Sequence, residues 1–290
     1  MAGAFLTHSL GRLFSRAVLA LALALALVPG LADPASAART MTNDQIMALV
    51  REAFDKESFE KGLEEVRWLK DAGFIYQPGL TVPRAGTCPI QDDWDSRAVL
   101  SGMVAADRTA AFLFGTYADV KRETETLREL VPELPARLLA PKDQEALQQK
   151  LDTKRGRALL AERTMTLWDE LLKRAGKSEK SLRFLGAYFY GDQIERFYLA
   201  SVMILAAAET GDLDAWRLKM SRGGEMRDVL MALSREGLVG DAKHQKERDA
   251  RLKELFRLVS ANGYRPPLKN LQRLVKICQE ERNRYAAPVR

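Results

Sequence analysis

Two apolar stretches decide the fold of this chain: AVLSGMVAADRTAAFLFGTYA at residues 98–118 and FLGAYFYGDQIERFYLASVMILAAA at residues 184–208. The only charged residues in them are Asp107, Arg108, Asp192, Glu195 and Arg196. Neither stretch alternates polar and apolar residues as a half-buried strand does, and each is long enough for several helical turns. Helices this apolar are normally enclosed by other helices on most sides. We therefore predict an all-α fold, a multi-helix bundle that encloses these two helices.

Helical periodicity also dominates the rest of the chain. Thr42 and Gln45 have the spacing of a capping box, and Ser178 precedes the second apolar helix as a helix-starting residue. Prolines interrupt the helical pattern at residues 132–141 and at residues 74–92. The second segment is the one long loop, and it is a candidate lid or a loop packed against the helices. We expect about nine or ten helices, packed antiparallel or orthogonally, with a superhelical trend as an open alternative.

Residues 1–37 have the three parts of a cleavable secretory signal peptide. Arg12 and Arg16 supply the positive start, residues 17–28 form an apolar run, and Ala37 ends a small-residue cleavage site. An uncleaved membrane anchor would need about 20 apolar residues, and this run is shorter. We therefore predict a periplasmic protein that is not transmembrane after cleavage, with residues 38–290 as a single all-helical domain.

The last part of that domain, residues 243–290, contains thirteen Lys or Arg and five Asp or Glu. Such asymmetry indicates an anionic partner, although a solvated basic helix face is the simpler interpretation. In an exported protein the partner would be an anionic envelope component or another protein, rather than nucleic acid. The final helices could alternatively lie on a membrane surface.

Cysteine and histidine content limits the chemistry. The two cysteines, Cys88 and Cys278, predict a disulfide in an exported protein, with two free thiols as the alternative. After cleavage His244 is the only histidine, and its charged neighbourhood predicts a solvated side chain. One histidine does not build the usual zinc site, so we predict no metal and no cofactor. The acids of residues 91–96 more simply cap a helix than bind calcium.

The acids of the two apolar helices form the candidate site. The candidate ligand-binding residues are Asp107, Glu195, Tyr188 and Tyr198. An arginine follows each acid, but adjacent helical residues point about 100° apart, so the partners of the acids must come from elsewhere. A buried carboxylate either finds donors or has its pKa raised. Alternative roles are a two-carboxylate hydrolase using Asp107 and Glu195, and a structural role satisfied by arginines or tyrosine hydroxyls.

The segment from Leu100 to Gly115 resembles one in a group of uncharacterised exported helical proteins of Gram-negative bacteria. Those proteins carry a small-residue helix with a glycine, then an aspartate, then aromatic residues before a turn. Residues 186–200, which contain Glu195, resemble a second segment of the same group. The resemblance implies an all-helical exported fold and no particular mechanism. We therefore predict a non-enzymatic binding or scaffolding protein of unknown ligand, and assign no catalytic residue.

Overall fold

The computed structural model describes residues 39–53, 55–57, 59–60, 63, 76–82, 93–131, 152–209 and 223–286. These residues belong to one compact unit, Arg39–Arg290. The predicted signal peptide at residues 1–37 lies outside the described residues, as do Cys88, residues 83–92 of the predicted loop and the linker at residues 132–141.

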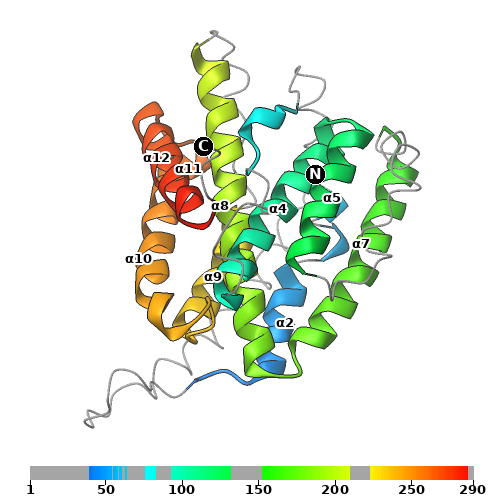
Figure 1. Ribbon diagram of the computed structural model, residues 1–290, viewed down its shortest axis with the longest axis vertical. Helices are drawn as coiled ribbons and strands as arrows, with labels where there is room; N and C mark the ends of the chain where they lie inside the picture. The colour runs from blue at the N-terminus through cyan, green and yellow to red at the C-terminus, as the bar shows by residue number, and fades with distance from the viewer. Residues whose placement is uncertain are drawn as a thin grey trace, which may run out of the picture. The chain divides into compact units, whose positions relative to one another are not determined.

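All regular structure in the described residues is helical, which confirms the predicted all-α class (Figure 1). This described part of the chain contains nine α-helices, one short 3-10 helix and no strand. In chain order the elements are α2 (Asn43–Ala53), η1 (Pro78–Leu80), α4 (Trp94–Phe114), α5 (Tyr117–Leu130), α7 (Lys154–Ala175), α8 (Glu179–Glu209), α9 (Gly223–Arg235), α10 (Ala242–Val259), α11 (Ala261–Tyr264) and α12 (Leu268–Tyr285).

Side-chain caps explain where several helices begin. Gln45 Oε1 accepts from the Thr42 N–H at 2.8 Å, and Thr42 Oγ1 accepts from the Gln45 N–H at 3.3 Å, which confirms the predicted capping box. The Asp93 carboxylate accepts hydrogen bonds from two backbone N–H groups in the first turn of α4. Ser178 Oγ accepts from a backbone N–H of α8 at 3.1 Å. Local sequence therefore sets these helix starts.

The two apolar stretches form α4 and α8, which pack side by side over much of their length (Figure 1). The helices run parallel, because contacts follow the same order along both: Val99 touches Gly191, and farther along Ala110 and Phe114 of α4 line one cavity with Leu199 and Met203 of α8. The expected antiparallel or orthogonal packing is wrong for this pair. The chain passes through α5 and α7 before it reaches α8, so α8 is free to run in the direction of α4.

Two glycines allow the backbones of α4 and α8 to touch. A Cβ on Gly102 would lie 1.9 Å from the carbonyl oxygen of Tyr188, and a Cβ on Gly191 would lie 1.9 Å from that of Val99. Any larger side chain would therefore push the helices apart. This contact fixes the register that places Asp107 beside Glu195.

The C-terminal helices pack on the other side of α8. In Figure 1 α10 and α12 lie to the left of α8, and α4 and α5 lie to its right. The α10–α12 pair is antiparallel, since Glu254 pairs with Arg273 while the earlier Glu247 pairs with the later Arg284. No described helix combines the length and the apolar character that crossing a membrane requires.

Cys278, one of the two cysteines of the predicted disulfide, has no sulfur partner among the described residues, and Cys88 lies outside them, so the disulfide stays a prediction. Cys278, on α12, has 0% of its surface exposed. Burial raises the pKa of the Cys278 thiol, and the nearby carboxylates of Glu195 and Glu281 raise it further. Cys278 therefore acts as a small apolar core residue.

Candidate functional site

The structure brings together two of the predicted site residues, Asp107 of α4 and Glu195 of α8. Both side chains are 0% exposed. The two carboxyl groups lie close enough for each to alter the ionisation of the other, so one of them keeps a proton when the other ionises. We call these two residues the acid pair.

The cationic partner of the acid pair is Arg282 of α12. Its Nε lies 2.8 Å from Glu195 Oε2. Its guanidinium carbon lies 3.9 Å from the centre of the ring of Tyr198, another predicted site residue. Arg282 belongs to the basic C-terminal part of the chain, residues 243–290, yet its side chain is only 6% exposed. The acid pair therefore receives its charge partner from a helix far along the chain.

The arginines that follow the two acids in sequence bond elsewhere, as helical geometry predicts. Arg196 Nε lies 2.6 Å from Asp192 Oδ2, and Arg108 Nε donates to Thr124 Oγ1 at 2.9 Å. Tyr188, the remaining predicted site residue, has Asp192, Arg196 and Arg108 as its charged neighbours. Tyr188 thus belongs to a different group from the acid pair.

The segment Tyr76–Val82, which includes η1, lies against the acid pair. The Val82 N–H donates to Asp107 Oδ2 at 2.8 Å, and the Leu80 carbonyl accepts from Arg282 Nη2 at 2.6 Å. Val82 itself is buried, with 5% of its surface exposed. This part of the predicted loop is therefore packed onto the helices.

Burial raises the pKa of both members of the acid pair. The pKa of Asp107 lies well above its ordinary value because the group is desolvated and because Glu195 is close by. Burial raises the pKa of Glu195 to about 7 despite the opposing charge of Arg282. Near neutral pH the acid pair therefore retains a proton, and its remaining negative charge is balanced by Arg282.

A small apolar cavity of about 20 Å³ lies one helical turn beyond the acid pair. Its lining residues are Tyr76, Gln77, Leu80, Ala110, Phe114, Leu199 and Met203. This volume holds little more than one water-sized group. Neither acid lines the cavity, so the acid pair and the cavity are neighbours under the segment Tyr76–Val82.

This geometry limits what the acid pair can do chemically. A two-carboxylate hydrolase needs both acids to reach substrate and water. Here Arg282 lies against Glu195, the Val82 N–H bonds to Asp107, and neither acid has exposed surface. The arrangement favours a structural role for the acid pair.

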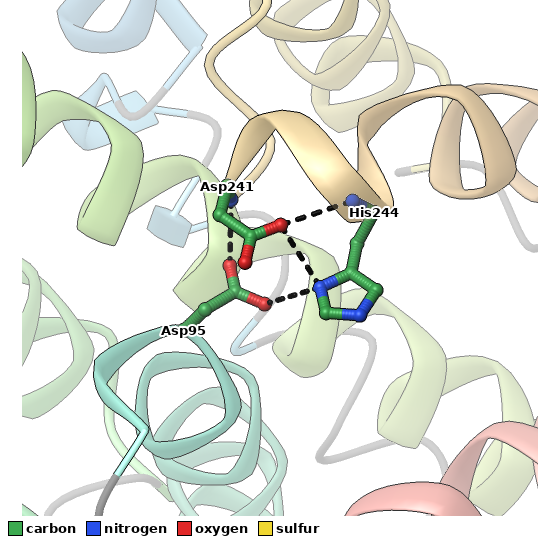
Figure 2. A group of neighbouring side chains, drawn as sticks. All are labelled: Asp95, Asp241 and His244. Carbon is green, nitrogen blue, oxygen red and sulfur yellow. Dashed lines mark hydrogen bonds and ion pairs between the residues drawn. The ribbon is translucent and has the colours of Figure 1, made fainter.

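A second ionisable group, which no sequence pattern indicated, lies where α4 and α10 begin (Figure 2). Asp95, Asp241 and His244 each place one potential ligand atom within 4.8 Å of the other two. His244 Nδ1 lies 2.9 Å from Asp241 Oδ1 and 3.3 Å from Asp95 Oδ2. The prediction that His244 is solvated is wrong: only 27% of its side chain is exposed, because the first turn of α10 packs against the start of α4.

Arg248 determines the character of this second group. Its Nη1 and Nη2 donate to the two carboxylate oxygens of Asp95 at 2.8 and 2.5 Å. The Asp241 N–H donates to Asp95 Oδ1 at 2.9 Å, while Asp241 Oδ1 accepts from the His244 N–H as the cap of α10. Carboxylates already bound by a buried guanidinium and by backbone donors are poor ligands for a divalent cation. The geometry therefore favours an ion-pair and capping network over a metal centre.

The same arginine ties three further elements together. Arg248 Nη2 donates to Tyr285 Oη at 2.9 Å, and the guanidinium lies 5.3 Å from the centre of the Tyr190 ring. A Cβ on Gly240, whose φ is 95°, would lie 1.7 Å from Arg248 Nη1, so both the conformation and the space require glycine. Arg248 is 1% exposed, although its sequence neighbours are charged and exposed.

The outward side of α10 and α12 is basic. Every acid of these two helices has a cationic partner: Glu247–Arg284, Asp249–Lys253, Glu254–Arg273, Glu280–Arg251 and Glu281–Arg251. Six exposed cations have no acidic partner among the described residues: Lys243, Lys246, Arg257, Arg265, Lys269 and Lys276. We call these six residues the basic face.

Among known proteins, no family model, no curated protein and no solved structure matches this chain. The functional conclusion therefore rests on the acid pair, the Asp95–Arg248 network and the basic face.

Proposed function

We propose that this chain is a periplasmic, non-enzymatic binding or scaffolding protein that binds an anionic envelope component through its basic face. One observation carries the proposal: the acids of α10 and α12 all have cationic partners, whereas six exposed cations have no acidic partner among the described residues. An anionic partner would neutralise this excess charge.

Helical spacing places most of the basic face in two stripes. Lys243, Lys246 and Arg257 recur at three-residue and eleven-residue intervals along α10, so they share one side of that helix. Lys269 and Lys276 are seven residues apart on α12. Ion pairs between the two helices run between the stripes, so both stripes border the same solvent-facing seam. An extended anionic surface or polymer suits such an arrangement better than a single small anion does.

The two ionisable groups of the interior support a non-enzymatic role. The acid pair is enclosed, and a hydrolase would need both acids to open toward solvent. His244, the one histidine outside the predicted signal peptide, already contacts two carboxylates. The predicted signal peptide at residues 1–37 supports an envelope partner rather than nucleic acid.

The test is binding of the purified protein to two anionic probes, namely phosphatidylglycerol vesicles and soluble polyglutamate, with phosphatidylcholine vesicles as the neutral reference. We expect binding to at least one anionic probe, no binding to the neutral vesicles, and weaker binding as salt rises, because exposed charges are screened. Binding to vesicles alone would favour the membrane-surface alternative, and binding to polyglutamate would favour an acidic polymer or protein.

Two charge-matched variants sharpen the test. The first replaces Lys243, Lys246, Lys269 and Lys276 with Gln, and the control replaces Lys154, Lys173, Lys177 and Lys180, which are also exposed, with Gln. Each lysine near an anionic surface contributes about 1 kcal/mol, so the first variant should lose binding by more than about tenfold. The control should bind as the wild type does. Equal losses in both variants, or no binding to either anionic probe at low salt, would refute the proposal.

A further inference from the structure

The segment Tyr76–Val82 is attached to the acid pair and its arginine by two hydrogen bonds. Val82 N–H donates to Asp107, and the Leu80 carbonyl accepts from Arg282. Both bonds end on ionisable side chains. The attachment at this end of the segment therefore depends on the charges beneath it.

The other end of the segment is attached in the same way. Tyr76 Oη accepts from Arg122 Nη2 at 3.1 Å and donates to Glu123 Oε1 at 3.4 Å. The remaining hydrogen bonds of the segment, among the described residues, are internal to it. Every hydrogen bond that the described structure gives between this segment and the helices thus involves an ionisable side chain.

The segment is also the layer between the acid pair and solvent. Its middle residues, Gln77, Pro78 and Gly79, are exposed, whereas Val82 and the acids beneath are buried. Glu195 Oε1, Glu195 Oε2 and Asp107 Oδ1 are buried and accept no aligned hydrogen bond among the described residues, although Arg282 Nε lies 2.8 Å from Oε2. The acid pair therefore relies on its proton and on Arg282.

We propose that Tyr76–Val82 is a latch, closed while the acid pair holds a proton and released when both carboxyls are ionised. Two carboxylates against one guanidinium would leave an uncompensated negative charge without water, which is unfavourable. The helices cannot separate easily, because α4 and α8 are in backbone contact at Gly102 and Gly191. The segment is the part that can move to admit water. This inference is independent of the basic face.

The groups that face the acid pair come from every element around it. They are Tyr198 of α8, Arg282 and Cys278 of α12, Glu123 and Arg122 of α5, and Tyr76 of the segment. Burial raises the pKa of the Tyr76 and Cys278 side chains, so both stay neutral near pH 7. Burial also raises the pKa of Glu123, whose ionisation acts in the same direction as that of the acid pair. Glu195 ionises first, with its pKa at about 7, and the pair loses its last proton only when Asp107 ionises, whose pKa lies well above its ordinary value, so release falls above neutral pH.

Release of the latch would also open the apolar cavity. Tyr76, Gln77 and Leu80 form one wall of that cavity, and residues of α4 and α8 form the other. Moving the first wall uncovers the apolar side chains of the second, Phe114 and Leu199 among them. The class of ligand that fits the uncovered surface is a small, uncharged apolar molecule.

The test is hydrogen–deuterium exchange of the full chain at about pH 6 and about pH 9.5, because only the higher pH favours loss of the last proton of the acid pair. Exchange is expressed as protection relative to unstructured-chain rates at each pH, with a peptide from α10 as the internal reference. We expect the protection of the peptide covering residues 76–82 to fall at least about tenfold at the higher pH, while the α10 peptide changes less. Binding of the neutral dye Nile red should increase in parallel.

Two variants separate the latch from general destabilisation. Asp107→Asn keeps an acceptor for Val82 N–H and a donor for Glu195 but leaves one carboxylate for Arg282, so its latch should stay closed at both pH values. Asp192→Asn is the matched control, since Asp192 is a largely buried acid of α8 paired with Arg196, and it should retain the pH response. If Asp107→Asn loses helical circular dichroism, Glu195→Gln replaces it. Equal protection of residues 76–82 at both pH values in the wild type would overturn the inference, as would an unchanged response in a folded Asp107→Asn.

Discussion

Helix α4 carries two buried carboxyl groups that differ in the number of positive charges available to each acid. Asp95, at the start of the helix, has the guanidinium of Arg248 to itself through two hydrogen bonds. Asp107, near the middle, shares the single Arg282 with Glu195. Both acids are 0% exposed, so burial alone does not distinguish them.

The difference shows how a protein interior can hold either a fixed charge or a movable proton. Where acid and base are matched and every oxygen is bonded, the ion pair joins helices as a permanent connection. Where two acids meet one base, the excess charge is removed by a proton, and stability becomes dependent on pH. The Asp95–Arg248 pair connects α4 to α10. The acid pair with Arg282 connects α4, α8 and α12 to the segment Tyr76–Val82.

The largest expected effect comes from removing the matched arginine. Arg248→Met leaves Asp95 buried without its cation, and breaking a buried pair in this way costs about 3–5 kcal/mol in the free energy of unfolding. Urea denaturation followed by circular dichroism measures it. Arg282→Met is the comparison: at about pH 5.5 its loss should be smaller, because the acid pair can take up a second proton. Equal losses for the two variants at that pH would remove the distinction between the clusters.

A second, smaller effect is expected from the contact that sets the position of the acid pair. Gly102 lies between Asp95 and Asp107 on α4, and Gly102→Ala would place a Cβ 1.9 Å from the Tyr188 carbonyl oxygen. Overpacking of this kind costs about 1–3 kcal/mol. Gly79→Ala, where nothing lies within 4 Å of the added Cβ, is the control and should change thermal stability little. If both variants melt at the wild-type temperature, the backbone contact does not hold α4 against α8.

The acid pair, which has one arginine for two acids, should make the protein less stable as pH rises. The pKa of Glu195 is about 7 in the folded protein and about 4.3 when unfolded, so the folded state binds more protons between these values. Its contribution is complete below the unfolded pKa and declines as pH rises through the folded pKa. From about pH 5.5 to about pH 8.5 the free energy of unfolding should fall by about 2 kcal/mol. Glu195→Gln should flatten this slope; a wild type that is equally stable at both pH values would contradict the assignment.

The smallest effect is expected at a surface ion pair, which provides the benchmark for the two buried clusters. Arg273 and Glu254 join α12 to α10 at 2.9 Å, with 46% and 30% of their side chains exposed. A double-mutant cycle with Arg273→Gln and Glu254→Gln should give a coupling below about 1 kcal/mol, weakened further by salt. A coupling free energy as large as the destabilisation by Arg248→Met would show that burial does not determine the strength of these ion pairs.

Much of the local structure could be predicted from the sequence. Helical periodicity identified the two apolar helices. The structure also confirms the Thr42–Gln45 capping box and the start of a helix at Ser178. These features depend on residues within one or two turns of each other. The same reasoning predicted that Arg108 and Arg196 would not serve the acids beside them, and both bond elsewhere.

The partners across the fold could not be predicted in this way. Arg248 and Arg282 follow the same charged pattern as their exposed neighbours, yet each is nearly completely buried. His244 also lies in a charged stretch and still packs between two carboxylates. The local sequence does not distinguish a position that faces solvent from one that faces another helix. The difference depends on which distant residues pack against that position.

The sequence by itself determined that the chain is helical, where several helices begin, and which two helices are apolar enough to be enclosed. It also singled out Asp107 and Glu195, because an acid in an apolar stretch conflicts with its surroundings. Only the tertiary structure decided that α4 and α8 run parallel, that the two acids lie together beside one arginine, Arg282, and that Asp95 has Arg248 to itself. The physical reason is range: hydrogen bonds and periodicity within a helix are local, whereas the charge balance of a buried acid depends on side chains brought from distant helices by packing.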